Sequence, residues 1–140
     1  MTASRWEHFE HQADIGLRGY GATLAEAFGQ IACALTAVIT DLPGVRVEQP
    51  VEIRCSAPDW ESLLVEWLNA LVYEMAARHM LFSRFDVRME GADLHAVAGG
   101  EKIQTERHRP AVEVKAATYH ALAVRRQPDG SWMVQCVVDV

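Results

Sequence analysis

The sequence predicts an α+β fold in which two amphipathic helices pack on a largely antiparallel β-sheet. Apolar residues recur at steps of three and four through Leu24–Val38 and again through Trp60–Met75, the spacing of one buried helix face. From Phe85 onward most segments alternate apolar and polar residues, as half-buried strands do. Two helices followed by a run of strands, without regular alternation of strand and helix, are typical of the α+β class.

A short hairpin is the first expected element. Trp6–His11 alternates large and polar residues, and extended character resumes over Leu17–Tyr20 until Gly21 breaks it. The bend between the two strands is expected at or near His11–Asp14.

The first helix is expected to begin after Thr23, whose hydroxyl can cap it. Glu26 lies three residues later and completes a capping box. The helical spacing of apolar residues continues to about Thr40, and Pro43-Gly44 should end the helix.

The second helix has the clearest pattern in the chain. Ser56 with Asp59 resembles a cap, and Pro58 is tolerated in a first turn. The apolar stripe of Trp60–Met75 then predicts about five helical turns. We interpret this stripe as core-facing, with a partner-binding ridge as the alternative, because polar residues occupy the other face: Glu61, Glu66, Glu74 and Arg78.

The other strands follow from alternating patterns and turn residues. Val45–Cys55 predicts two short strands around Pro50. Further strands are expected over Phe85–Met89, Leu94–Ala98, Val112–Val124 and Trp132–Val140, with turns at Gly99-Gly100 and Pro128-Asp129-Gly130.

Length and charge restrict the function. The 140 residues fit one domain, residues 1–140, with a real core. A net charge of −6, with no basic run longer than Arg125-Arg126, argues against direct non-specific binding of nucleic acid. No segment reaches the ~20 apolar residues of a membrane span, and no signal-peptide pattern is present. We therefore expect a cytoplasmic protein that does not act at a membrane; its oligomeric state is left open.

The three cysteines do not predict a metal or disulfide site. Cys33, Cys55 and Cys136 are far apart, odd in number, and each lies in an apolar run. No Cys-x-x-Cys or Cys/His spacing of a zinc site occurs. They are expected to be small buried residues.

Three acidic groups could converge on a cation. Asp14 lies in a polar bend between two apolar strands, and Asp139 with the carboxylate of Val140 lies at the tip of the last strand. If the tip meets the bend, three oxygen donors come together, a set that suits calcium or magnesium better than zinc. The alternatives are a local turn cap for Asp14 and a solvated, frayed end for the last residues.

Other polar residues have ordinary structural explanations. His11 with His108 or His120 could form a zinc or general-base site, but no metal-binding histidine spacing occurs, and a histidine bonding across a sheet is the alternative. Lys115 should share a sheet face with Glu113 and Ala117, opposite the apolar residues, where a solvated Lys–Glu face is the simple interpretation.

Five blocks in order along the chain resemble motifs of the archease family. The opening block, Phe9–Gly16, is similar to F-E-H-x-A-D-I-G, although Gln12 stands where a small hydroxyl residue is expected. Residues 101–110 match only loosely. The other four blocks are Thr23–Phe28, Leu63–Asn69 (L-L-x-x-W-L-N), Glu113–His120 (E-V-K-A-x-T-Y-H) and Val138–Val140 (a D-V or D-I end).

The resemblance implies an accessory protein rather than an enzyme. Archeases promote guanylylation and turnover of RtcB-type RNA ligases in tRNA splicing and RNA repair, so RNA would contact the ligase. The family binds a divalent cation, usually calcium with magnesium or manganese as alternatives, which here implies Asp14, Asp139 and Val140 as ligands. The resemblance also suggests candidates for activation of the partner, at positions that match these motifs or, for Glu101 and His108, match only loosely: His11, Glu101, His108, Glu113, Lys115 and His120.

Two other functions remain open from the sequence. One is a metal-dependent phosphoester hydrolase that uses Asp14, His11 and His108 to activate water, although no general base lies at a recognisable spacing. The other is a chaperone-like interaction module in which the metal is merely structural.

Overall fold

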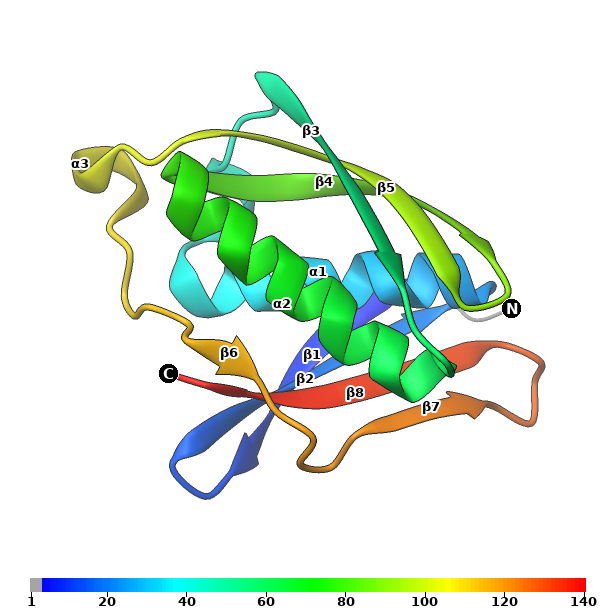
Figure 1. Cartoon of the computed structure of the whole chain (residues 1–140). Coiled ribbons are helices and arrows are strands. Elements are labelled where there is room, and N and C mark those ends of the chain that lie inside the picture. Colours follow the sequence, from blue (N-terminus) through cyan, green and yellow to red (C-terminus); the bar gives the residue numbers. More distant parts are fainter. Residues whose placement is uncertain (1–3) are drawn as a thin grey trace.

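A computed structural model describes residues 4–140 as two antiparallel sheets with two long helices between them (Figure 1). The elements, in chain order, are β1 (Arg5–His11), β2 (Asp14–Gly21), α1 (Leu24–Ile39), η1 (Leu42–Gly44), β3 (Gln49–Ser56), α2 (Trp60–Arg78), β4 (Met80–Glu90), β5 (Asp93–Lys102), α3 (Thr105–His108), β6 (Ala116–Ala117), β7 (Ala123–Arg126) and β8 (Trp132–Asp139).

The predicted α+β class is confirmed, but the strands form two sheets instead of one. The first sheet has the order β1-β2-β8, and both β6 and β7 pair with the far edge of β8. The second has the order β3-β5-β4. Figure 1 shows α1 and α2 crossing between these sheets, so each helix buries side chains against strands.

Both helices begin at the predicted positions. The Thr23 hydroxyl accepts a hydrogen bond from the N–H of Glu26 over 3.1 Å, and the Asp59 carboxylate caps α2 through the N–H of Ser62 over 2.7 Å. Pro58 precedes the α2 cap, so its predicted place in the first turn is wrong. Helix α2 ends at Arg78, and the next residue, His79, has a left-handed φ of 54°.

The helix stripes face the core as predicted, except that Trp60 at the start of α2 is exposed. Trp67 and Phe28 are fully buried, and the indole N–H of Trp67 donates to the carbonyl oxygen of Phe28 over 3.0 Å. The hydroxyl of Thr36 donates to the carbonyl of Phe82 over 2.6 Å, which joins α1 to β4. These bonds satisfy polar atoms that would otherwise be costly in the core.

The predicted long strand over residues 112–124 is wrong. Within this stretch only the short strands β6 and β7 pair with β8, and between them residues 118–122 lie opposite just Cys136 and Val137. The extra residues leave the sheet as a turn in which Ala121 has a φ of 51°. The turn is fixed where Gln135 Nε2 donates to the Ala121 carbonyl over 2.9 Å.

Two other predictions for strands are also wrong. Val45 lies outside a strand after η1, and β3 is one strand that includes Pro50. Gly99-Gly100 is part of β5 instead of a turn. Gly100 is required there because a Cβ would overlap the carbonyl of Leu81. The register between β4 and β5 shifts just after this point, between Phe82 and Arg84.

None of the helices within residues 4–140 is long and apolar enough to cross a bilayer.

Candidate functional site

The two predicted aspartate ligands lie at neighbouring strand ends. β1 and β2 form the expected hairpin, which closes at the pair His11 and Asp14. β2 runs antiparallel to β8, and their last pair is Ile15 with Val138. Asp14 therefore lies directly before Ile15 on β2, and Asp139 lies directly after Val138 on β8, so the two aspartates are at the same end of the paired strands.

Both carboxylates are accessible. Asp14 is half-buried and Asp139 is exposed. Within residues 4–140, neither side chain forms a hydrogen bond or ion pair. The main chain of Asp139 is fixed at the edge of β8 opposite β2. There the Asp139 carbonyl accepts a hydrogen bond from the N–H of Lys115 over 2.8 Å, and Asp139 pairs with Ala116 of β6. Val140 follows and is half-buried.

The donors of this strand end are compatible with a hard cation. The side chains of Asp14 and Asp139 offer only oxygen, the ligand that calcium and magnesium prefer, and the expected third donor is the carboxylate of Val140. No cluster of three His, Cys, Asp or Glu side chains with metal-binding geometry occurs in the described part of the chain. A three-donor cation site at this strand end would therefore need Val140 to supply the third oxygen donor.

Two histidines adjoin this strand end. The rings of His11 and His120 are 5.8 Å apart between centroids, and the buried Nδ1 of His11 has no hydrogen-bond partner in the described chain. His120 belongs to the turn of residues 118–122, where its N–H donates to the Thr118 hydroxyl over 3.2 Å. The exposed ring of Tyr119 precedes it. The turn thus presents aromatic groups close to the hairpin bend.

Lys115 and Glu113 are exposed as predicted, but Ala117 is buried, so the three do not share one face. The reason is the short β6: alternation holds only while a segment is extended along a sheet. Glu113 lines a separate pocket beside α2.

Glu101 and His108 belong to a second cluster away from this strand end. In Figure 1 α3 lies at the upper left, whereas the β1–β2 bend lies at the bottom. Glu101 is 1 % exposed; it pairs with Arg107 and accepts the N–H of Arg46 over 2.6 Å and Nε2 of His108 over 3.1 Å. Nδ1 of His108 accepts the N–H of Gln104 over 2.8 Å. Both ring nitrogens of His108 are therefore engaged.

The electrostatics of Glu101 follow from these contacts. Burial by itself raises the pKa of the carboxyl, but hydrogen bonds from Arg107, the Arg46 backbone and His108, with the Arg107 charge, outweigh burial and lower the pKa to about 2. The cluster joins the end of β5 to α3 and to the loop after η1. These contacts hold the three segments together, whereas the sequence suggested Glu101 and His108 only as candidates for activation of the partner.

The three cysteines are free; Cys136 is buried as predicted, whereas Cys33 and Cys55 are half-buried. Burial raises the pKa of the Cys33, Cys55 and Cys136 thiols to about 11, with Glu66 adding to the effect at Cys55. Thiols in such surroundings are poor nucleophiles and poor metal ligands.

The chain is similar to proteins of one family over nearly its whole length. Residues 6–140 match the Archease protein family (MTH1598/TM1083). The protein archease of Pyrococcus furiosus is 44 % identical over 140 residues, which cover 97 % of this chain and 99 % of that protein. The protein archease of Methanosarcina acetivorans is 39 % identical over 141 residues, which cover 97 % and 96 %.

Solved structures are similar as well. The solution structure of Methanobacterium thermoautotrophicum protein 1598 superposes with a TM-score of 0.82 at 32 % identity, covering 96 % of this chain and 98 % of that one. The crystal structure of an archease from Thermotoga maritima has a TM-score of 0.58 at 20 % identity, covering 94 % of each chain, and supports the fold alone. From the family match and these relatives, we conclude that the chain belongs to the archease family.

Proposed function

We propose that this protein is a metal-binding activator of an RtcB-type RNA ligase and promotes guanylylation and turnover of that ligase in tRNA splicing and RNA repair. It is an accessory protein, and the ligase supplies the catalytic residues and contacts the RNA. The observation that supports this most directly is the pairing of Ile15 with Val138, which leaves Asp14 and Asp139 at adjacent strand ends in a member of the archease family.

Asp14, Asp139 and Val140 would hold the cation, which we propose to be calcium, with magnesium or manganese as alternatives. When bound, the cation supplies positive charge beside the phosphates of a nucleotide in the ligase. The aspartates would hold the ion through their carboxylate oxygens. The hydrogen bond from the Lys115 N–H to the Asp139 carbonyl fixes the main chain of Asp139. Lys115 adds a cation that faces solvent beside them.

The net charge of the protein is consistent with a ligase, and not this protein, contacting the RNA. At −6 it would repel RNA on its own. A basic nucleotide-binding partner would instead be attracted to it by charge complementarity, which speeds encounter and favours the correct orientation.

A phosphoester hydrolase is a poorer explanation. The hydrolase hypothesis needs His108 beside Asp14, but both ring nitrogens of His108 bond within the Glu101 cluster. A chaperone-like module is the second candidate, since the related Thermotoga maritima protein is described as a possible chaperone and an apolar pocket opens beside α2. In that case, client binding would not depend on Asp14.

The decisive measurement is single-turnover formation of the ligase–GMP adduct with this protein present. Asp14→Ala and Asp139→Ala should each abolish stimulation, because an acidic protein without its cation brings only negative charge to the nucleotide site. Both variants should stay folded by circular dichroism, since removing one of two like charges relieves repulsion. Asp86→Ala, an exposed aspartate of β4, is the matched control and should stimulate like the wild type.

The result can contradict the proposal in two ways. If folded Asp14→Ala and Asp139→Ala both stimulate as the wild type does, the cation has no part in activation. If the wild type does not stimulate the ligase but suppresses aggregation of an unfolded client, the chaperone function replaces the activator.

A further inference from the structure

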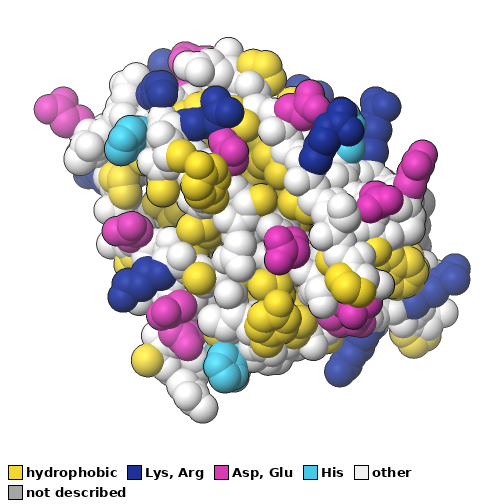
Figure 2. All heavy atoms as spheres, in the orientation of Figure 1, with side chains coloured by type: hydrophobic (Ala, Val, Ile, Leu, Met, Phe, Trp, Pro, Cys, Tyr) yellow, Lys and Arg dark blue, Asp and Glu magenta, His cyan; other side chains and the backbone are white. Residues whose placement is uncertain are grey.

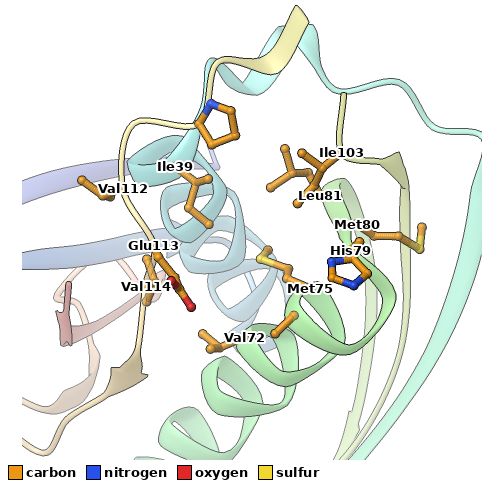
Figure 3. A pocket seen from close by; sticks show the side chains of 12 residues that line it. Ile39, Val72, Met75, His79, Met80, Leu81, Ile103, Val112, Glu113 and Val114 are labelled. Atoms are coloured by element: carbon orange, nitrogen blue, oxygen red, sulfur yellow. The ribbon is translucent and has the colours of Figure 1, made fainter. Parts of the chain in front are cut away.

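An apolar pocket opens beside the C-terminal half of α2. It has a volume of about 320 Å³ and lies between the C-terminal half of α2 and residues 110–114 (Figure 3). Val72 and Met75 of α2 form one side and Val112 and Val114 the other. Figure 2 shows hydrophobic side chains gathered over this part of the surface, among scattered charged groups.

The pocket has an uncompensated carboxylate at its edge. Among the described residues that line it, only Glu113 and His79 are ionisable, and Figure 3 shows them on opposite sides of the opening. Glu113 is exposed and forms no hydrogen bond or ion pair within residues 4–140. Arg78, next to His79, pairs with Glu74, and Lys102, next to Ile103, donates to the Arg78 carbonyl over 2.7 Å, so neither cation pairs with Glu113.

The size and chemistry indicate what could bind there. Sites for small ligands typically enclose ~300–1,000 Å³ and place several polar groups around the ligand. This pocket is at the lower end of that range and offers one free carboxylate at its edge, which suits one or two side chains of a protein segment. Deep apolar pockets on protein surfaces commonly accept the anchor residues of a partner.

We propose that this pocket binds a segment of the partner protein in which a bulky apolar side chain lies next to a lysine or arginine. The apolar side chain fills the space between α2 and Val112, and the cation pairs with Glu113. The identity of the partner rests on the proposed function, so the segment belongs to the ligase. Residues 110–114 continue into Lys115, whose N–H bonds to Asp139, so a ligase held here is positioned beside the carboxylates.

The test is the Kd of the ligase for this protein, measured by isothermal titration calorimetry with two pocket variants. Ala76→Phe places a ring at the pocket from an exposed helix position, and Glu113→Lys reverses the charge at its edge. Each should weaken binding about tenfold or more, a difference typical of a lost anchor contact. Ala77→Phe and Glu106→Lys, both exposed and outside the pocket lining, should remain within about twofold of the wild type.

The outcomes separate this inference from the proposed function. If both folded pocket variants bind the ligase with wild-type affinity while the wild type stimulates adduct formation, the pocket inference is wrong and the activator function stands. If the ligase neither binds nor responds to the wild type, both are wrong.

Discussion

The backbone N–H of Lys115 donates a hydrogen bond of 2.8 Å to the carbonyl oxygen of Asp139. Two residues later the N–H of Ala117 donates to the side-chain oxygen of Asn69 in α2 over 2.8 Å. The segment between the pocket and the strand end is thus bonded to β8 and to α2 through its main chain. Changes to the Lys115 side chain leave these bonds in place.

Lys115→Ala should therefore weaken activation of the ligase without unfolding the protein. The side chain is exposed and is proposed as a solvent-facing cation, so its loss should reduce adduct formation less than Asp14→Ala does. Calcium affinity and melting temperature should remain close to wild type. Lys115→Arg keeps the charge and should recover most of the stimulation; equal loss in both variants would instead indicate a role specific to the ammonium group.

A C-terminal extension past Val140 should weaken cation binding. An added peptide replaces the proposed third carboxylate with a neutral amide and crowds the end of β8. Calorimetric titration of calcium or manganese into protein tagged at either end is the measurement, with the N-terminal tag as the control. Equal affinities in the two forms would show that the Val140 carboxylate is not a ligand.

Local signals were sufficient to predict the helices and the first hairpin. Thr23 and Asp59 each supply a side-chain cap, and the stripes that follow bury one face against strands. The bend at His11–Asp14 was also predicted correctly. In each case the determining residues lie within a few positions of one another, so no tertiary information was needed.

The strand pairing could not be predicted in the same way. Residues 112–124 alternate as one strand would, but β8 offers only two residues opposite the turn of residues 118–122. Gly99-Gly100 has the composition of a turn, yet the close approach of Leu81 is what requires glycine at the second position. Both features depend on neighbours distant in sequence.

The candidate site was predictable in part. The residue pattern predicted that the bend of Asp14 meets the strand end of Asp139, and both residues lie directly beyond the last pair of β2 and β8. Their role as ligands stays a prediction. His108 could not be assigned from sequence, because its partner Glu101 comes near it only when β5 and α3 fold together. The pocket was missed, since its sides come from α2 and from residues 110–114.

Gly19→Ala should destabilise the fold by at least ~1–3 kcal/mol, the cost of overpacking a tight contact. A Cβ at this position of β2 would overlap the backbone of α1 at Ala27 and Ile31, which cannot move as a flexible side chain can. Urea unfolding followed by circular dichroism measures the change. Gly44→Ala is the control, because a Cβ there meets open space; equal stability of both variants would show that β2 and α1 can separate at no cost.

Glu101→Gln should destabilise the protein most at neutral pH. The buried carboxylate accepts bonds from Arg46 and His108 and pairs with Arg107. Removing its charge leaves the guanidinium of Arg107 without its counter-ion, a change of ~2–4 kcal/mol in the free energy of unfolding by analogy with broken buried pairs. Exposed Glu106→Gln is the matched control and should have little effect.

The effect of Glu101 has a definite pH dependence. The folded pKa of about 2 lies below the ordinary value of 4.5, so the ionised carboxylate stabilises the fold fully above about pH 4.5. This stabilisation is lost as the pH falls from about 4.5 toward about 2, because the unfolded chain then binds the proton more readily. The difference between wild type and Glu101→Gln in urea unfolding should shrink over that interval. A difference that is the same at pH 7 and pH 3 would mean that the charge of Glu101 does not stabilise the cluster and that packing alone accounts for the loss.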